Sequence, residues 1–290
     1  MRNELNLWVA GGDMRQAKLA ELLAADGHTV HAYALERLGA LDGVEMEESL
    51  EGAALADCVV LPLPAAGEGS LLNAPLSGRK HPLALVLDAL RPGQVICAGM
   101  VGSQTAALAA DRGLTLHDYF AREELAVANA VPTAEGAIQL AMEELPITLH
   151  GARVLVIGYG RLGRVLADRL AGLKARVSVA ARRYADLAWA ENCGYGVEHT
   201  GQLEGWLCGY DLVVNTVPVR VLREAELADL KPGCLVIDLA SKPGGVDFDA
   251  AARLGVKAFW ALSLPGKVAP VTAGKSIKTT IYNILTELGV

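Results

Sequence analysis

The strongest constraint on the fold is an apolar run that passes directly into a glycine-rich turn. The run ends in Val154-Leu155-Val156-Ile157, and the turn reads Gly158-Tyr159-Gly160-Arg161-Leu162-Gly163. An amphipathic helical pattern follows, and residues 175–180 form a second apolar run, which completes most of a β-α-β unit. The motif in this context predicts a Rossmann domain that binds a dinucleotide.

Each glycine of this turn has a mechanical task in such a fold. Gly158 permits the tight turn, Gly160 lets the backbone approach a pyrophosphate, and Gly163 lets helix and strand pack closely. The helix N-terminus then presents free N–H groups and a positive dipole end to the phosphates. We therefore expect residues 158–163 to bind the cofactor, and a merely structural glycine turn is the alternative.

The residues after the second apolar run bear on the choice of cofactor. NAD sites usually place an acidic residue about 20 residues after the fingerprint, where it binds the ribose 2′-hydroxyl. This chain has Arg182-Arg183 instead. Because guanidinium groups pair with a phosphate and a carboxylate would repel it, we expect NADP(H) rather than NAD(H). The alternative is a solvated arginine pair that contacts nothing.

Length and composition place the chain among two-domain globular proteins. It has 290 residues, of which 52% are hydrophobic, and a net charge of −7, which argues against a broad nucleic-acid surface. Its five cysteines are odd in number and show no paired spacing, which fits a reducing cytosol. Since we find neither a signal peptide nor the apolar stretch of about 18 residues that a spanning helix needs, we expect a cytoplasmic protein.

Apolar strands alternate with helical segments along most of the sequence. This rhythm predicts an α/β fold with two doubly wound parallel-sheet domains, the second a Rossmann dinucleotide-binding domain. We expect a substrate and partner domain over residues 1–130, joined by a C-terminal helix over 272–290. The NADP-binding domain would then cover 131–271, entered through a bridging helix over 132–146 with Thr133 as its N-cap.

Polar residues follow several strands of the second domain, where ligands of such sheets bind. The candidates for contact with the ribose or nicotinamide are Asn215, Thr216, Val217, Pro218, Ala240, Ser241 and Lys242. A plain turn at 215–218 and an exposed Lys242 are the alternatives. Residues 264–274 are rich in glycine, and we expect them to form a further loop beside the nicotinamide.

The first domain offers candidates for the substrate side. Asp13 and Arg15 follow the first strand, and Arg122 precedes the bridging helix, where we expect a cleft. The arginines could bind carboxylates, and Asp13 could orient a group or exchange a proton. Alternatively, Asp13 caps the first helix and Arg15 is solvated. The six histidines show no metal-binding spacing, so we expect no metal site.

Several motifs together resemble the family of the dipicolinate synthase A subunit over nearly the full length. They are the 158–163 fingerprint, Gly-Gly-Asp-Met-Arg-Gln at 11–16, Ala-Arg-Glu-Glu-Leu-Ala-Val-Ala-Asn-Ala-Val-Pro-Thr-Ala-Glu-Gly at 121–136, Asn-Thr-Val-Pro at 215–218, Asp-Leu-Ala-Ser-Lys-Pro-Gly-Gly-Val-Asp-Phe at 238–248 and Leu-Pro-Gly-Lys-Val-Ala-Pro-Val-Thr-Ala-Gly at 264–274. The resemblance implies formation of dipicolinate from dihydrodipicolinate, or its hydrated tetrahydro precursor, with a nicotinamide cofactor. It also implies the mother cell of a sporulating bacterium and, as partner, the flavoprotein-like B subunit of dipicolinate synthase. We expect a homo-oligomer as well.

Two other functions fit parts of the pattern. An amino- or hydroxy-acid dehydrogenase would need a His or Lys proton relay to a carbonyl, and no histidine stands at an obvious strand end. A scaffold that senses NADP without turning it over would carry the same fingerprint, because a fold alone does not establish chemistry.

Overall fold

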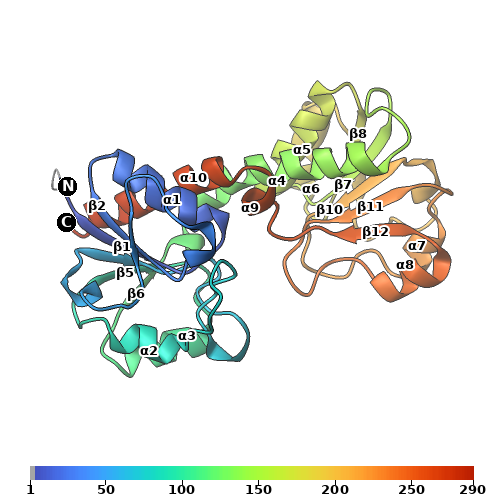
Figure 1. Cartoon of the computed structure of the whole chain (residues 1–290). Helices are drawn as coiled ribbons and strands as arrows, with labels where there is room; N and C mark the ends of the chain where they lie inside the picture. Colours follow the sequence, from blue (N-terminus) through green and yellow to red (C-terminus); the bar gives the residue numbers. More distant parts are fainter. Residues whose placement is uncertain (1–3) are drawn as a thin grey trace. The chain divides into compact units, whose positions relative to one another are not determined.

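The computed structural model describes residues 4–290, which form two compact units. The first unit contains the chain up to Asn129 together with Ala269–Val290, and the second contains Ala130–Val268. Each is built around a six-stranded sheet whose neighbouring strands are all parallel (Figure 1). The prediction of two doubly wound α/β domains is confirmed.

The sheet of the first unit has the strand order β3-β2-β1-β4-β5-β6. Its strands are β1 (Asn6–Ala10), β2 (Thr29–Tyr33), β3 (Glu45–Glu47), β4 (Cys58–Val60), β5 (Val95–Ala98) and β6 (Leu116–Asp118). The order reverses between β1 and β4, so the loops that follow these two strands leave in opposite directions. A crevice at such a switch point is where open α/β sheets bind ligands.

Helices cover both faces of this sheet. They are α1 (Met14–Ala25), α2 (Leu83–Asp88), α3 (Ser103–Ala110) and the C-terminal helix α10 (Pro270–Glu287). α10 lies beside α1 (Figure 1), and its apolar face, which includes Ile277 and Ile281, joins the core formed by α1 and the central strands. The helices approach closely at Gly274, where a Cβ atom would lie 3.0 Å from the Arg15 carbonyl oxygen.

The second unit repeats this topology with the order β12-β11-β10-β7-β8-β9. Its strands are β7 (Arg153–Ile157), β8 (Arg176–Ala181), β9 (Gly196–His199), β10 (Leu212–Asn215), β11 (Leu235–Asp238) and β12 (Lys257–Trp260). β10 and β11 are buried along their whole length, as expected for central parallel strands with helices on both faces. The switch point lies between β7 and β10.

The helices of the second unit are α5 (Arg161–Gly172), α6 (Tyr184–Asn192), α7 (Glu224–Ala228), α8 (Phe248–Leu254) and α9 (Leu264–Val268). Leu166 and Leu170 on α5 are buried against β7 and β8, which explains the amphipathic pattern after the fingerprint. Residues 264–274 are helical except for Ala269, with 264–268 in α9 and 270–274 in the first turns of α10, so the predicted glycine-rich loop is wrong. Leu264 and Val268 pack at Gly136, where a Cβ atom would approach their side chains to 3.1–3.2 Å.

The helix that leads from the first unit into the second is longer than expected. α4 spans Glu123–Glu144 and contains Pro132, so the predicted start at 132 with Thr133 as N-cap is wrong. A proline inside a helix removes one backbone hydrogen bond. The residues before it are mainly Glu, Leu and Ala, which are strong helix formers and keep the helix continuous through this position.

Candidate functional site

The glycine turn of the second unit has the geometry of a dinucleotide cradle. Gly158 adopts a φ of +100°, and its N–H donates to the Ala180 carbonyl oxygen at 2.7 Å. A side chain at Gly158 would place its Cβ 2.2 Å from Thr216 Oγ1, and one at Gly163 would place it 2.0 Å from the Gly158 carbonyl oxygen. These two glycines are therefore required by the protein itself.

Gly160 differs from its two neighbours in the fingerprint. A Cβ atom there would meet no described heavy atom within 4 Å, and the backbone lies in the extended region at φ −80°. Nothing inside the described part of the chain therefore requires glycine at this position. The open space lies at the N-terminus of α5, which begins at Arg161, and the first N–H groups of an α-helix generally lack an acceptor within the helix. The cradle fits a pyrophosphate.

The arginines after β8 are not equivalent. Arg183 donates to both carboxylate oxygens of Asp186 at 2.8 and 2.9 Å, and this pair raises the pKa of Arg183. Asp186 also lies 3.5 Å from Arg164, whose guanidinium sits over the Tyr159 ring. Arg182 is exposed, and across residues 4–290 its guanidinium makes no hydrogen bond or ion pair. Arg182 is thus the cation that remains available to an anionic ligand.

The residues at the end of β10 contact the glycine turn across the switch point between β7 and β10. The Thr216 hydroxyl donates to the Ile157 carbonyl oxygen at 2.9 Å, next to Gly158. Asn215 is fully buried, and its amide donates to Asp238 and to the Val217 carbonyl oxygen. Asn215 therefore shapes the 215–218 turn from within the protein, whereas Thr216 and Val217 line the cradle beside Gly158.

Asp238 is a buried carboxylate that the sequence motifs did not single out as a site residue. Its side chain accepts hydrogen bonds from the Asn215 amide at 2.8 Å and from the N–H groups of Ala240, Gly245 and Val246 at 3.0, 2.7 and 3.2 Å. It fixes both ends of the loop that carries Ser241 and Lys242, which are exposed. The available signal was its place at the end of an apolar strand, directly opposite Asn215 in the parallel register.

Asp13 and Arg15 lie together at the switch point of the first unit. Asp13 is the N-cap of α1, which confirms the alternative that Asp13 caps the first helix. Arg15 is buried rather than solvated, and it donates to both Asp13 oxygens and, at 2.7 Å, to the Leu63 carbonyl oxygen in the loop after β4. The pair connects the loops that follow β1 and β4, and the Asp13 side chain keeps 30% of its surface exposed.

Arg122 occupies a different environment. Its guanidinium donates to Glu124 at 2.9 Å and to both carboxylate oxygens of Glu287 on α10 at 2.5 and 2.8 Å. The hydrogen bond from Arg122 lowers the pKa of Glu287. Both carboxylates would compete with a substrate carboxylate for this guanidinium.

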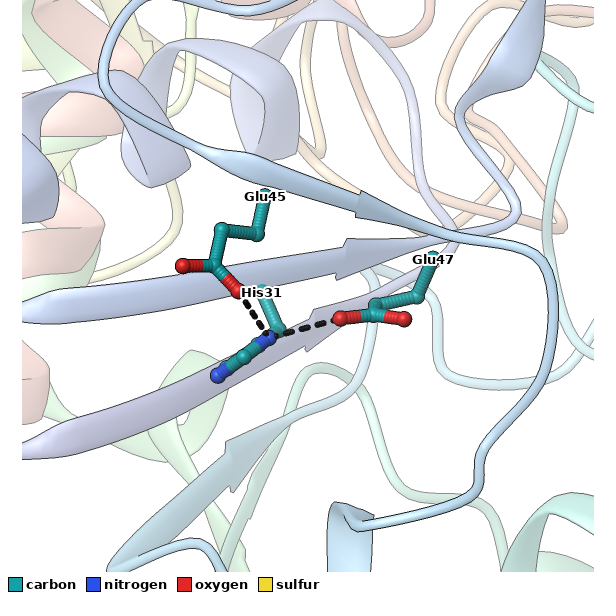
Figure 2. A group of neighbouring side chains, drawn as sticks. All are labelled: His31, Glu45 and Glu47. Atoms are coloured by element: carbon teal, nitrogen blue, oxygen red, sulfur yellow. Dashed lines mark hydrogen bonds and ion pairs between the residues drawn. The ribbon is translucent and has the colours of Figure 1, made fainter.

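One cluster of potential metal ligands is not visible in the spacing of the histidines along the chain. His31, Glu45 and Glu47 converge on β2 and β3, with one potential ligand atom from each lying within 4.8 Å of the others (Figure 2). They come together through strand pairing, because β3 follows β2 only after 11 intervening residues. The spacing of the histidines along the chain therefore could not reveal this cluster.

No helix within residues 4–290 combines the length and the apolar character needed to cross a membrane.

Comparisons with known proteins place both units in one family. Residues 6–120 match the N-terminal domain of the dipicolinate synthase A subunit, and residues 123–250 match the NAD-binding domain of D-isomer specific 2-hydroxyacid dehydrogenases. The dipicolinate synthase A subunit of Bacillus subtilis is 32% identical over 99% of this chain and 98% of its own. A crystal structure of the Bacillus subtilis protein has a TM-score of 0.88, covering 100% of this chain and 98% of that one at 31% identity.

A second solved structure gives the same result. The dipicolinate synthase A subunit from Bacillus halodurans has a TM-score of 0.89 at 30% identity, and the match covers 97% of each chain. The resemblance seen in the sequence motifs is confirmed, and it extends through both units. The chain belongs to the family of the dipicolinate synthase A subunit.

Proposed function

We propose that this chain binds NADP(H) in its second unit and oxidises dihydrodipicolinate, or its hydrated tetrahydro precursor, to dipicolinate. The observation that supports a dinucleotide most directly is the open space at Gly160, between two glycines that the protein needs for its own packing. The match to an NAD-binding dehydrogenase domain agrees with it. The family supports the substrate, since relatives that match over the full length are named as the A subunit of dipicolinate synthase.

The preference for NADP(H) rests on charge at the end of β8. Arg182 is the first residue after β8. In NAD sites this part of the fold usually carries an acidic residue that binds the ribose 2′-hydroxyl. The nearby carboxylate, Asp186, is largely buried and held by Arg183 and Arg164. A 2′-phosphate would therefore face the unpaired Arg182, with Arg183 close by, rather than a free carboxylate.

Titration of the purified chain with NADP⁺ and NAD⁺ by calorimetry tests this preference. We expect Arg182→Ala to weaken NADP⁺ binding about tenfold or more, because one charge-assisted phosphate contact contributes about 1.5–3 kcal/mol, and to leave NAD⁺ binding unchanged. Arg183→Ala should have the smaller effect, since Asp186 already neutralises Arg183. Equal affinity of the parent for the two cofactors would contradict the assignment.

The bound cofactor would supply a hydride acceptor. The hydrated tetrahydro precursor would first lose water to give the dihydro compound. Loss of a hydride and a proton then makes the dihydropyridine ring aromatic, so the protein mainly has to hold the substrate in position. Lys242 is exposed on the loop fixed by Asp238, and it is the cation of the second unit that we assign to a substrate carboxylate. In the first unit, Asp13 and Arg15 form the polar group at the switch point, and Arg122 would need to leave Glu287 before it could bind substrate.

We further propose that the chain acts in the cytoplasm of the mother cell of a sporulating bacterium, as a homo-oligomer with the flavoprotein-like B subunit of dipicolinate synthase. Turnover of dihydrodipicolinate by the chain alone, compared with turnover after the B subunit is added, tests this dependence. NADPH formation by the isolated chain would show that it is catalytic by itself. Tight NADP⁺ binding without turnover under both conditions would contradict the enzymatic role and favour a scaffold.

A further inference from the structure

The sheet edge of the first unit gathers three metal-ligating side chains on one face. His31 on β2 lies directly opposite Glu45 on β3 in the parallel register, and Glu47 is two residues further along β3. Because side chains alternate between the faces of a strand, Glu45 and Glu47 point to the same side as His31. Figure 2 shows both carboxylates directed at the imidazole. The strand register, rather than a flexible loop, brings the three groups together.

The distances suit a common ion. His31 Nδ1 lies 2.8 Å from Glu47 Oε1 and 3.4 Å from Glu45 Oε2. Zn²⁺ binds nitrogen and oxygen ligands at about 2.0–2.2 Å in tetrahedral geometry, so two ligand atoms on one ion are about 3.3–3.6 Å apart. Since all three atoms already lie within 4.8 Å of one another, a small rotation of the exposed Glu45 side chain would complete the set.

The imidazole is also held in place before any ion binds. Trp8, the partner of His31 in β1, stacks on its ring with centroids 5.0 Å apart and an interplanar angle of 20°. The His31 side chain is only 15% exposed. A ring fixed in this way loses little conformational freedom when it binds a metal.

Charge favours a cation at this position. Two carboxylates converge on one ring nitrogen, and a neutral imidazole leaves the group with two negative charges. Even a protonated imidazole leaves one, and its single Nδ1 proton cannot make two short hydrogen bonds at once. A divalent ion would neutralise the group and bridge the edge strand β3 to β2.

We propose that His31, Glu45 and Glu47 form a binding site for a divalent transition-metal ion such as Zn²⁺. One imidazole and two carboxylates are ligands that Zn²⁺, Mn²⁺ and related ions accept, and three protein ligands leave room for water. Within residues 4–290, His31 Nε2 makes no hydrogen bond, so the ring lacks the outer partner that strengthens many metal sites. We therefore expect micromolar affinity and an exchangeable ion whose effect is to stabilise the β2–β3 edge.

Calorimetric titration of the metal-free full-length chain with Zn²⁺ tests the proposal. The parent should carry Cys193→Ser and Cys208→Ser, because these two exposed thiols could bind zinc themselves. We expect one Zn²⁺ per chain and a rise in Tm on binding. His31→Gln and Glu47→Gln should each weaken binding by about tenfold or more, since each removes one of three ligands.

Glu48→Gln is the matched control, because it removes the same charge from an exposed neighbour outside the group. It should bind Zn²⁺ like the parent and keep the rise in Tm. Circular dichroism of each variant without metal establishes that it is folded. Failure of the parent to bind Zn²⁺, or equal binding by folded Glu47→Gln and parent, would overturn the proposal and leave a histidine–carboxylate ion pair.

Discussion

Replacement of Gly160 by alanine should separate cofactor binding from folding. The backbone at Gly160 is extended, with φ −80° and ψ −161°, and a Cβ atom there would meet no described atom within 4 Å. Alanine can adopt this conformation, and it restricts the unfolded chain more than glycine does. We expect the free energy of unfolding to stay within about 1 kcal/mol of the parent value, because this gain is opposed by the poorer N-cap preference of alanine at the start of α5.

The loss in cofactor affinity should be large by comparison. The added methyl group would occupy the space in front of the first N–H groups of α5, and would push a pyrophosphate away from them. Loss of one charge-assisted hydrogen bond is worth about 1.5–3 kcal/mol, which corresponds to about 10–160-fold in Kd. Calorimetric titration with NADP⁺ measures this change, and chemical denaturation of the same sample measures stability.

Two further glycines make the comparison strict. Gly172, at the end of the same helix, also has open space around it, so Gly172→Ala should leave both stability and affinity near the parent values. Gly163→Ala should destabilise the chain, because its Cβ would lie 2.0 Å from the Gly158 carbonyl oxygen. Unchanged NADP⁺ affinity in a folded Gly160→Ala variant would refute the assignment of the open space to the pyrophosphate.

Two other predictions concern buried or half-buried carboxylates of the second unit. Asp238→Asn should lower the free energy of unfolding by about 2–4 kcal/mol, because the amide nitrogen would face N–H groups that now donate to a carboxylate oxygen. Urea denaturation measures this loss. A loss no larger than in the exposed control Asp249→Asn would contradict the role of Asp238. Burial alone would raise the pKa of Asp211, but hydrogen bonds from Lys231 and the Arg153 N–H lower it overall. The stabilisation from Asp211 is therefore complete above about pH 4 and lost as the pH falls through the lowered pKa. The difference in unfolding free energy between parent and Asp211→Asn should shrink from pH 7 to pH 2.5. A difference that grew on acidification would contradict the lowered pKa of Asp211.

The central strands of both sheets could be predicted from the sequence, whereas the edge strands β3 and β9 could not. β7 and β10 are continuous apolar runs because helices cover both faces. β3 reads Glu-Met-Glu and β9 reads Gly-Val-Glu-His, with too little apolar character to stand out from a loop. Edge strands are short and carry charge, so their pairing becomes visible only through the register with β2 and β8. The group of His31, Glu45 and Glu47 could not be recognised from the sequence for this reason.

The residues of the candidate site likewise fall into those that the sequence could identify and those whose availability depends on the fold. The fingerprint glycines and Arg182 could be found because each follows from a local requirement, whether a φ angle, a close approach or an exposed charge. Whether Arg15, Arg122 and Asn215 are available depends on partners distant in sequence, which are Leu63, Glu287 and Asp238. A sequence pattern identifies a residue that is able to bind a ligand, whereas only the fold shows whether the protein already uses it.

The two units share one strand order, yet their glycine loops differ in a way that bears on where a dinucleotide binds. In the first unit, a Cβ at Gly11 would lie 2.8 Å from the Leu72 side chain, and one at Gly12 would lie 2.5 Å from Gln16. Side chains of the protein already fill this loop, and the Asp13 carboxylate occupies the α1 N-terminus, where it would repel a phosphate. In the second unit, Gly160 faces open space and the α5 N-cap is a glycine without a side chain. The same topology thus offers a phosphate cradle in one unit and a closed, acid-capped loop in the other, which supports the proposed binding of NADP(H) in the second unit rather than in the first.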